Sequence, residues 1–366
     1  MNFTISRELL LRPLQAVIGV VERRQTMPIL SNILLAVHDD EISVTATDLE
    51  VELIAKSKVN DIGTAGDITV PARKLLDICR ALPNESTIKL QLEGDRLVIK
   101  SGRTRFVLAT LPAADFPVID DIDANRDIRL AQKDLRRLLE KTQFSMAQQD
   151  VRYYLNGLLL ETEKGVVRTV ATDGHRLALC EVTVEEQEGA PLQVIIPRKG
   201  VLELHRLLGD ENEVELSIGS NHIRATIGDI RFTSKLIDGR FPDYDRVIPV
   251  PDGNILKASR EYLRSALQRA AILSNEKYRG IRLGIAKDCL MLQANNPDQE
   301  EAHDELEVEY DGEDLEIGFN VNYLLDALAA VEAEEVEVGF VDMNSSCIIQ
   351  GPDSEHARFV VMPMRL

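Results

Sequence analysis

The sequence predicts an α+β protein made of three repeated domains, each with two helices packed on antiparallel sheets. Short phrases recur in one order at a spacing of about 125 residues. Each repeat also holds two segments with helical periodicity, and short alternating runs between them indicate strands. This period is too long for a solenoid unit of about 20–50 residues. Each copy is therefore expected to be a whole domain, at residues 1–125, 126–253 and 254–366.

Three phrases carry the repeat, and each is weaker in its third copy. They are Thr47-Asp48-Leu49 with Thr172-Asp173-Gly174 and Asn295-Asn296; Val70-Pro71 with Ile196-Pro197 and Phe319-Asn320; and Phe116-Pro117 with Phe241-Pro242 and Val361-Met362-Pro363. Three anchors that keep one order and one spacing are difficult to obtain by chance. They therefore indicate duplication of a domain.

One helix is expected near the start of each repeat. Ser6 is placed to cap the first helix, and Pro13 inside it should kink it. In the second repeat this helix is expected from Gln132 to Met146. In the third repeat Ser259 is placed to cap it. Their apolar sides are formed by Leu10, Leu14, Val17 and Val21; Leu135, Leu138, Leu139 and Thr142; and Leu263, Ala266, Leu267 and Ala270.

A second helix is expected in the middle of each repeat, at 71–82, 197–208 and 320 to about 331. The first two begin with proline, which suits the first helical turn. Two β-hairpins are also predicted, because alternating runs flank Gly102-Arg103 and Gly228-Asp229.

Composition excludes several classes of protein. No apolar run is long enough for a membrane span, and the N-terminus lacks the plan of a signal peptide. Six unclustered histidines make a metal site improbable, and no cofactor is expected. The cysteines show no C-x-x-C pair, which indicates a reducing compartment, and we expect the protein in the cytoplasm. They are Cys79, Cys180, Cys289 and Cys347.

The net charge of −19 is unevenly distributed. Acidic residues gather at 185–188 and 300–309, whereas Lys and Arg gather on five of the six expected helices. The helix at 320–331 carries neither. Basic residues on one amphipathic helix are usually only solvated. Their recurrence in an acidic protein favours contacts with phosphates, without reading of the base sequence.

Several stretches make the whole chain resemble a known family, the bacterial sliding clamp or processivity (beta) subunit of DNA polymerase III. The most specific stretches are 149–157, 171–177, 234–244, 271–276 and 361–366. The resemblance implies three DNA-clamp domains and a ring-forming homodimer with helices lining its hole. It also implies a non-catalytic role.

The implied function is that of a DNA sliding clamp that confers processivity on the replicative polymerase. In the family, the closed ring encircles double-stranded DNA without sequence preference and slides along it. A clamp loader opens and closes the ring with ATP. Replicative and translesion polymerases, the loader, mismatch-repair proteins and ligase bind an apolar groove through short peptide motifs.

The resemblance also assigns residues to DNA. Direct contacts are implied for Arg24, Arg73, Gln149, Tyr153 and Tyr154. An alternative for the tyrosine pair is packing within a strand. The basic helices are expected to ease the passage of DNA through Lys133, Arg137, Lys141, Arg198 and Arg264.

The implied partner groove is apolar with a basic rim. Its residues are Leu155, Thr172, Gly174, His175, Arg176, Leu177, Pro242, Arg246, Val247, Ser346, Met362, Pro363, Met364, Arg365 and Leu366. Arg176, Arg246 and Arg365 are expected to face acidic residues of a partner. An alternative for 172–177 is a tight turn in which Gly174 supplies an unusual backbone conformation.

The implied dimer interface brings apolar residues and opposite charges together. Phe106 and Leu108 would meet Ile272 and Leu273 of a second copy, although Ile272 and Leu273 could instead belong to the core. The charged residues are Lys74, Arg96, Arg103 and Arg105 on one side and Glu300, Glu301 and Asp304 on the other.

Two rival functions remain at this point. An enzyme could use Asp48, Asp173 and His175, but no nucleophile elbow, phosphate loop or metal-ligand spacing supports one. A scaffold ring without DNA would explain the repeats and the acidity, but it would not explain the basic helices.

Overall fold

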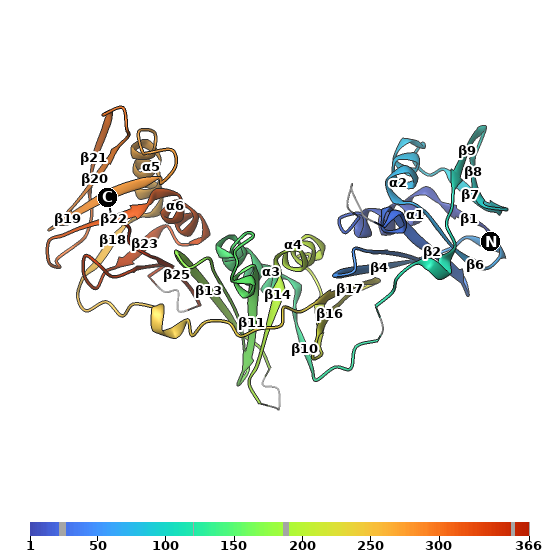
Figure 1. Ribbon diagram of the computed structural model, residues 1–366, viewed down its shortest axis with the longest axis horizontal. Helices are drawn as coiled ribbons and strands as arrows, with labels where there is room; N and C mark the ends of the chain where they lie inside the picture. The colour runs from blue at the N-terminus through green and yellow to red at the C-terminus, as the bar shows by residue number, and fades with distance from the viewer. Residues whose placement is uncertain (22–26, 120, 186–189, 353–355, 366) are drawn as a thin grey trace. The chain divides into compact units, whose positions relative to one another are not determined.

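The computed structural model describes residues 1–21, 27–119, 121–185, 190–352 and 356–365. The chain divides into two compact units, which are described separately. Unit 1 comprises Met1–Leu135 and Lys199–Leu236, and unit 2 comprises Arg136–Arg198 and Ile237–Leu366. Each unit contains one eight-stranded sheet and one smaller sheet with antiparallel strand pairs, which confirms the α+β prediction (Figure 1).

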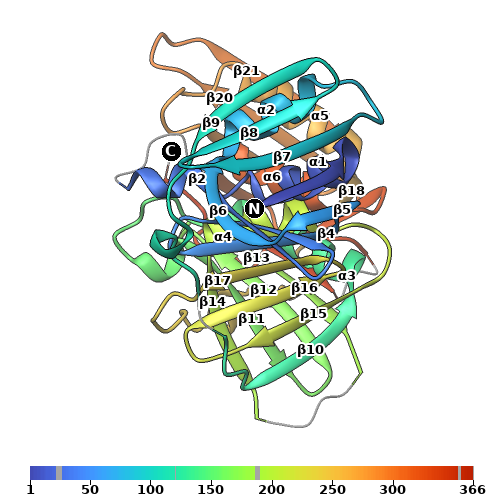
Figure 2. The same ribbon diagram turned by 90° about the vertical axis from the view of Figure 1, so that its right-hand side faces the viewer.

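The two sheets of unit 1 have eight and five strands. The larger has the order β10 (Arg126–Ala131), β15 (Glu213–Ile218), β16 (His222–Ile227), β17 (Ile230–Lys235), β4 (Val51–Lys58), β3 (Glu41–Thr47), β2 (Asn32–His38) and β6 (Gly66–Pro71). The smaller has the order β5 (Asp61–Thr64), β1 (Asn2–Ser6), β7 (Thr87–Glu93), β8 (Arg96–Ser101) and β9 (Thr104–Ala109). In Figure 2, β7, β8 and β9 run side by side on the face turned toward the viewer.

The two sheets of unit 2 have eight and four strands. The larger has the order β14 (Leu192–Pro197), β11 (Gly157–Glu163), β12 (Val166–Thr172), β13 (Arg176–Thr183), β25 (Ala357–Val361), β24 (Cys347–Gln350), β23 (Glu335–Gly339) and β18 (Ile255–Ser259). The smaller has the order β21 (Glu301–Glu307), β20 (Cys289–Asn295), β19 (Gly280–Ala286) and β22 (Leu315–Asn320).

Each large sheet joins strands from two successive repeats. In unit 1, β17 of the second repeat pairs with β4 of the first, from Ile230 opposite Ala55 onward. In unit 2, β13 of the second repeat pairs with β25 of the third. Pairing of this kind satisfies backbone groups that a sheet edge would leave open. The compact units therefore follow the sheets, and the domain boundaries near residues 125 and 253 stay a prediction.

The expected helices are present, with differences at their ends. They are α1 (Arg7–Val17), α2 (Ala72–Ala81), α3 (Gln132–Thr142), α4 (Arg198–Leu207), α5 (Arg260–Ala271) and α6 (Val321–Ala330). Pro13 lies within α1 and is buried. A 3₁₀ turn at Gln143–Ser145 follows α3, so the α-helix stops before Met146. The two predicted hairpins, β8–β9 and β16–β17, are confirmed.

The predicted serine caps are correct in position and wrong in mechanism. Ser6 and Ser259 occupy the N-cap positions of α1 and α5, but neither side chain makes a capping hydrogen bond. Both residues end a strand that runs directly into the helix. Asn320 does cap α6, because its side chain accepts a hydrogen bond from the N–H of Asn322 at 2.9 Å.

Basic side chains bind the C-terminal carbonyl groups of partner helices. Arg7, at the start of α1, donates to the carbonyl oxygens of Cys79 at 2.8 Å and Arg80 at 3.4 Å, at the end of α2. Arg260, at the start of α5, donates to the carbonyl of Val331 after α6 at 2.8 Å. The last carbonyls of a helix lack partners within it and carry partial negative charge. A basic residue there donates hydrogen bonds to these carbonyl groups and offsets their partial negative charge.

Basic side chains also bind the C-terminal ends of helices in the neighbouring repeat within each unit. Arg206 of α4 donates to the carbonyl of Ala16 in α1 at 2.5 Å. Lys141 of α3 donates to the carbonyl of Ala330, at the end of α6, at 2.6 Å. Part of the basic character of the helices therefore stabilises the fold.

The repeated Thr-Asp phrase forms the same turn in both units. The hydroxyl groups of Thr47 and Thr172 each donate to the carbonyl four residues later, at 3.0 and 2.7 Å. One carboxylate oxygen of Asp48, and one of Asp173, accepts N–H groups two and three residues later, at 2.7–3.1 Å. The second threonine phrase continues to Gly174, whose φ of +87° suits glycine.

Candidate partner groove and nucleic-acid interface

Unit 2 contains an apolar groove of about 180 Å³. It is bounded by the 3₁₀ turn Tyr153–Leu155, the start of β13, the 3₁₀ turn Asp245–Val247 and the end of β25. Predicted groove residues that line it are Leu155, Thr172, Gly174, Arg176, Leu177, Pro242, Val247 and Met362. The structure therefore brings together residues that are about 200 positions apart in the sequence.

The floor of the groove is part of the core of unit 2. Leu177, Tyr244 and Val360 line the groove and belong to one buried cluster that also includes Phe241. The repeated Phe-Pro phrase therefore anchors this wall from below, because Phe241 is buried and Pro242 faces the groove. A floor held by core packing keeps its shape without a ligand.

A buried polar network fixes Tyr244. Its hydroxyl donates to Glu161 at 2.5 Å and accepts from Arg168 at 3.0 Å. Burial would raise the pKa of Glu161, but hydrogen bonds from Tyr244 and Gln193 and the charge of Arg168 outweigh it and lower that pKa. The pKa of the Tyr244 hydroxyl is raised by burial and by its bond to Glu161. The tyrosine therefore stays neutral and locked in place.

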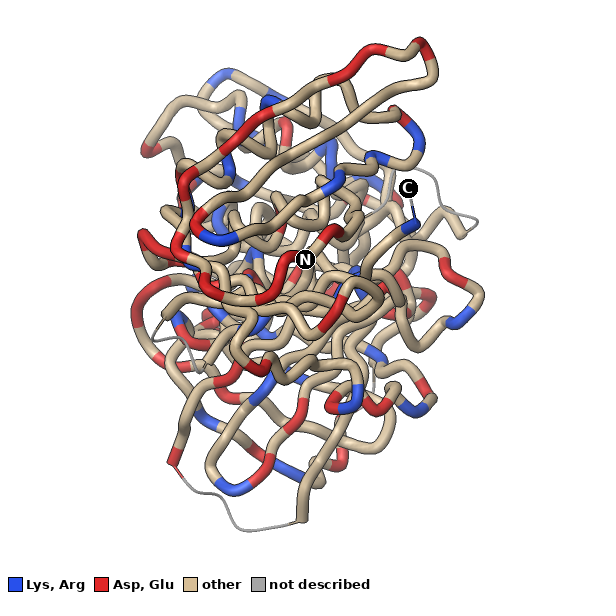
Figure 3. The backbone as a smooth tube through the Cα atoms, turned by 90° about the vertical axis from the view of Figure 1, so that its left-hand side faces the viewer, with Lys and Arg blue, Asp and Glu red and all other residues tan. Residues whose placement is uncertain are grey.

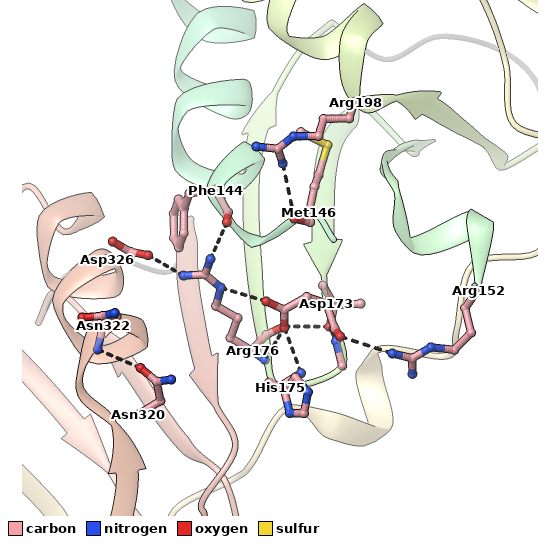
Figure 4. A network of polar contacts seen from close by, with 12 residues as sticks. Phe144, Met146, Arg152, Asp173, His175, Arg176, Arg198, Asn320, Asn322 and Asp326 are labelled. Carbon is pink, nitrogen blue, oxygen red and sulfur yellow. Dashed lines mark hydrogen bonds and ion pairs between the residues drawn. The ribbon is translucent and has the colours of Figure 1, made fainter. Parts of the chain in front are cut away.

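Arg176 is the centre of a second network (Figure 4). Its guanidinium pairs with Asp173 at 3.2 Å and with Asp326 of α6 at 2.5 Å, and it donates to the carbonyl of Phe144 at 2.7 Å. It also lies 4.6 Å from the ring centre of Tyr323. The charge of Arg176 is thus matched inside the chain. Arg176 therefore helps to hold the groove wall, and its expected contact with acidic residues of a partner stays a prediction.

Other predicted groove residues lie beside the lining. The ring of His175 stacks on Tyr323 at 6.4 Å, and its carbonyl accepts the N–H of Met362 at 2.8 Å. Ser346 donates to the carbonyl of Val247 at 3.4 Å. Arg246 is exposed and pairs with Asp243 at 2.7 Å.

The predicted groove residues at 363–365 are also not part of the lining. Pro363 and Met364 are half-buried, and the N–H of Met364 donates to the carbonyl of Gly318 at 2.8 Å. Arg365 is exposed. Leu366 lies outside the described residues. The contact of these residues with a partner stays a prediction.

Sequence reasoning missed four lining residues: Arg152, Tyr154, Tyr244 and Val360. The family resemblance assigns Tyr154 to DNA and not to the groove. Val360 lies in an apolar strand whose pattern does not distinguish core from groove. Tyr244 follows the Phe241-Pro242 phrase closely, and that proximity is the signal that could have found it.

The residues assigned to DNA in unit 2 lie mainly on one turn. Gln149 is exposed with a φ of +56°, and Tyr153 is 57% exposed. Tyr154 is half-buried against the groove core. The strand alternative for the tyrosine pair is wrong, because the two residues begin a 3₁₀ turn. Arg198 is half-buried and donates to the carbonyl of Met146 at 3.3 Å.

Arg73 belongs to unit 1 and is exposed on α2, where one of its nitrogens donates to the carbonyl of Val21 at 2.8 Å. Arg24 lies outside the described residues.

The basic helix residues differ in how much charge they leave for DNA. Lys133 is exposed and Arg264 is half-buried. Lys141 is only 9% exposed and pairs with Glu332 at 2.8 Å, and Arg137 lies 3.6 Å from the same carboxylate. The expectation that Lys141 faces DNA is therefore wrong, because its ammonium group is committed to the end of α6.

The apolar residues assigned to the dimer interface are placed unequally. Ile272 directly follows α5 and is 75% exposed, so the core alternative is wrong for it. Leu273 is half-buried. On β9, Phe106 is half-buried, whereas Leu108 is buried against its own sheet. β9 is an edge strand of its sheet, and so is β21 of unit 2.

The charged residues assigned to the interface are mostly exposed. Those exposed are Lys74, Arg96, Arg103, Arg105, Glu300 and Glu301. Asp304 instead pairs with Arg269 of α5 at 2.7 Å. Figure 3 faces the side of unit 2 that carries the smaller sheet and shows Asp and Glu recurring along its strands.

Nothing in the described part of the chain resembles a catalytic centre. Asp48 and Asp173 are occupied by their turns, and Asp48 also pairs with Lys199. Among the described residues, no group of three or more His, Cys, Asp or Glu could hold a metal ion. The cysteines are free, and burial raises the thiol pKa of Cys79 to about 12 and that of Cys180 to about 11. No helix in the described ranges is long and apolar enough to cross a membrane.

Repeated α+β domains that share sheets, together with an apolar groove of about 180 Å³, are the features of a clamp-type binding protein. Three family models match it: the N-terminal, central and C-terminal domains of the DNA polymerase III beta subunit, at residues 1–120, 129–243 and 245–365. The chain therefore belongs to the DNA polymerase III beta subunit family.

Relatives match along the whole chain. The chain is 54% identical to the beta sliding clamp of Pseudomonas aeruginosa and 53% identical to that of Escherichia coli, over 100% of both chains in each case. The crystal structure of the P. aeruginosa DNA polymerase III subunit beta superposes with a TM-score of 0.97, with 53% identity and full coverage of both chains.

Proposed function

We propose that the chain is the sliding clamp that gives the replicative DNA polymerase its processivity. Two copies close head to tail into a ring around duplex DNA and slide along it without catalysing a reaction. The observation that carries this proposal is the full-length match of all three repeats to proteins named beta sliding clamp. The four free cysteines fit a cytoplasmic protein.

The contact with DNA is electrostatic in this proposal. Duplex DNA carries about one negative charge per 1.7 Å of axis. Exposed Arg73 and Lys133 supply positive charge, and Gln149 and Tyr153 add polar and stacking contacts. Because the ring holds DNA by topology, weak non-specific binding of about 10⁻⁴ to 10⁻⁶ M is sufficient and permits sliding.

The groove binds short peptide segments of DNA polymerases, the clamp loader, mismatch-repair proteins and ligase. Its apolar floor suits two large apolar anchors, whose burial contributes roughly 3–6 kcal/mol before the cost of association. Affinity near a micromolar Kd, about −8 kcal/mol, is therefore expected. Exchangeable binding of this strength lets several proteins use one groove in turn.

The dimer interface joins β9 of one copy to the β21 side of another. Both are edge strands with open backbone groups, and exposed Ile272 adds apolar area. The arginines beside β9 face the acidic residues Glu300 and Glu301 of the second copy. This contact joins two different surfaces and closes into a ring with a second copy.

The test is retention on DNA of different topology. The protein is loaded onto nicked circular DNA by its clamp loader, and half of the sample is then linearised. A ring stays on circles and slides off linear ends. Equal retention on both forms would refute the ring and favour a scaffold without encircled DNA.

A further inference from the structure

The segment Gln149–Leu155, here called the 149–155 loop, carries residues of both candidate sites. Gln149 and Tyr153 are exposed and are assigned to DNA, and Val151 between them is 95% exposed. Arg152, Tyr154 and Leu155 line the partner groove. A ligand on the exposed residues and a peptide in the groove would therefore touch the same seven-residue segment.

Hydrogen bonds within the 149–155 loop and to the adjacent Asn156 hold the residues of the loop together. The N–H of Asp150 donates to the side-chain oxygen of Asn156 at 2.9 Å, and the side-chain nitrogen of Asn156 donates back to the carbonyl of Asp150 at 2.8 Å. The N–H of Leu155 donates to the carbonyl of Arg152 at 2.8 Å. The N–H of Asn156 also donates to the carbonyl of Tyr153 at 3.1 Å, so Asn156 links Tyr153 to Asp150.

Arg152 is the part of the loop that can change position. Asp150 holds its guanidinium through both carboxylate oxygens, at 3.0 and 2.8 Å, and also accepts the N–H of Arg152 at 2.8 Å. On the groove side, Arg152 donates to the carbonyl of Asp173 at 3.3 Å (Figure 4). It lies against Gly174, where an added Cβ would be 3.1 Å from its terminal nitrogens.

Rearrangement of the Asp150–Arg152 pair should cost little free energy. The side chain of Arg152 is 48% exposed, and exposed ion pairs contribute little to stability. A DNA phosphate placed near the loop would compete with Asp150 for the guanidinium and would repel the carboxylate. Arg152 would then turn toward the phosphate and withdraw from the groove wall.

We propose that the 149–155 loop couples DNA to the groove, so that a clamp on DNA binds partner peptides more tightly than a free clamp. Asp150 is the positioning residue, because it holds Arg152 in the wall when DNA is absent. Coupling between two sites is reciprocal, so an occupied groove also strengthens the contact with DNA. This inference rests on the proposed function, because it requires DNA inside the ring.

The test compares one sample before and after linearisation of the circular DNA. The probe is fluorescein-labelled griselimycin, a ligand with which the P. aeruginosa clamp has been crystallised. Loaded wild-type clamp is expected to bind it about fivefold more tightly than clamp released from the ends. Hydrogen exchange at the Arg152 amide, which donates to Asp150, is measured in parallel and should accelerate on DNA.

Two variants make the test specific. Asp150→Asn removes the ion pair that holds Arg152 in the groove wall, so its free form should already bind as tightly as loaded wild type, with a shift on loading below about twofold. Asp243→Asn is the matched control, because it frees Arg246 from another exposed ion pair near Val247 and should keep the wild-type shift.

The outcomes separate the two proposals. Clamp that is not retained on circles contradicts the proposed function. Clamp that is retained, with probe affinity and Arg152 exchange equal on and off DNA, overturns the coupling alone. An Asp150→Asn variant that keeps the full wild-type shift also overturns it.

Discussion

At the scale of single residues, burial and local partners decide what a charged side chain does. Lys133 and Lys141 are both basic residues of α3, yet one is exposed and the other is buried against the end of α6. Asp173 could belong to a catalytic pair by residue type, but its carboxylate holds a turn and Arg176. Residue type sets the possible chemistry, and the surroundings select from it.

Glu52 gives a prediction that depends on pH. It is 1% exposed on β4; one carboxylate oxygen accepts the N–H of Ile119 at 2.9 Å, and the other has no hydrogen-bond partner among the described residues. Burial raises its pKa, although the Ile119 N–H, Arg231 and Arg224 oppose the shift. A raised folded pKa stabilises the fold below the ordinary value of 4.5, and this stability is lost as pH rises through the folded pKa.

Glu52→Gln should therefore raise the free energy of unfolding at neutral pH, and the difference from wild type should vanish at pH below 4.5. Urea unfolding at both pH values measures it. Glu41→Gln, in an exposed pair with Lys56, is the control and should change little. A variant less stable than wild type at pH 7 would mean that the two arginines outweigh the cost of burial.

At the scale of elements, helices are joined through their C-terminal ends. Arg7 and Arg260 serve the ends of α2 and α6 within one repeat, and Arg206 and Lys141 serve the ends of α1 and α6 across two repeats. The charge of each basic group meets the negative end of a helix dipole. Hydrogen bonds at the C-terminal ends of helices therefore hold the helices of this fold together.

Arg7→Ala should lower the free energy of unfolding by about 1–3 kcal/mol, because it leaves the carbonyl oxygens at the end of α2 without a charged donor. Chemical unfolding monitored by circular dichroism measures the loss. Arg80→Ala, on the exposed side of the same helix, is the control and should cost less than about 0.5 kcal/mol. Equal losses for both variants would contradict the capping role.

Lys141→Met and Lys133→Ala should separate structural charge from DNA-facing charge. Lys141→Met removes the bonds to Ala330 and Glu332 and should cost about 1–3 kcal/mol of stability without changing the salt dependence of DNA binding. Lys133→Ala should leave stability unchanged and reduce the slope of log affinity against log salt by about 0.9 if it meets one phosphate. Salt titrations of DNA binding and unfolding curves together decide this. A changed slope for Lys141→Met would restore that residue to the DNA-facing set.

At the scale of the whole molecule, repeats are joined by shared sheets, and the edges that remain are candidates for assembly. β17 pairs with β4 and β13 pairs with β25, so the edges of these strands are already hydrogen-bonded within the chain. β9 and β21 each keep one open side. Opposite charges near those edges favour pairing between copies in a single orientation.

Ile272→Ala combined with Leu273→Ala should convert the dimer to monomers, because exposed Ile272 would lose its apolar contact in the interface. Sedimentation velocity at micromolar concentration measures the oligomeric state. Val250→Ala, which truncates another exposed apolar residue, is the control and should leave the dimer unchanged. An unaltered dimer in the double variant would count against this interface.

The sequence by itself determined the repeats, the fold class, all six helices and both hairpins, because apolar periodicity and turn residues act locally. The resemblance to the sliding-clamp family supplied the predicted groove residues, and eight of them line the groove in the structure.

Only the tertiary structure decided which residues share a surface. It put Val360 and Tyr244 in the groove, committed Lys141 to a helix end, and placed Arg152 between Asp150 and Gly174. The physical reason is that burial and pairing depend on residues far away in the chain. No local pattern records whether a lysine will meet water, a phosphate or the end of another helix.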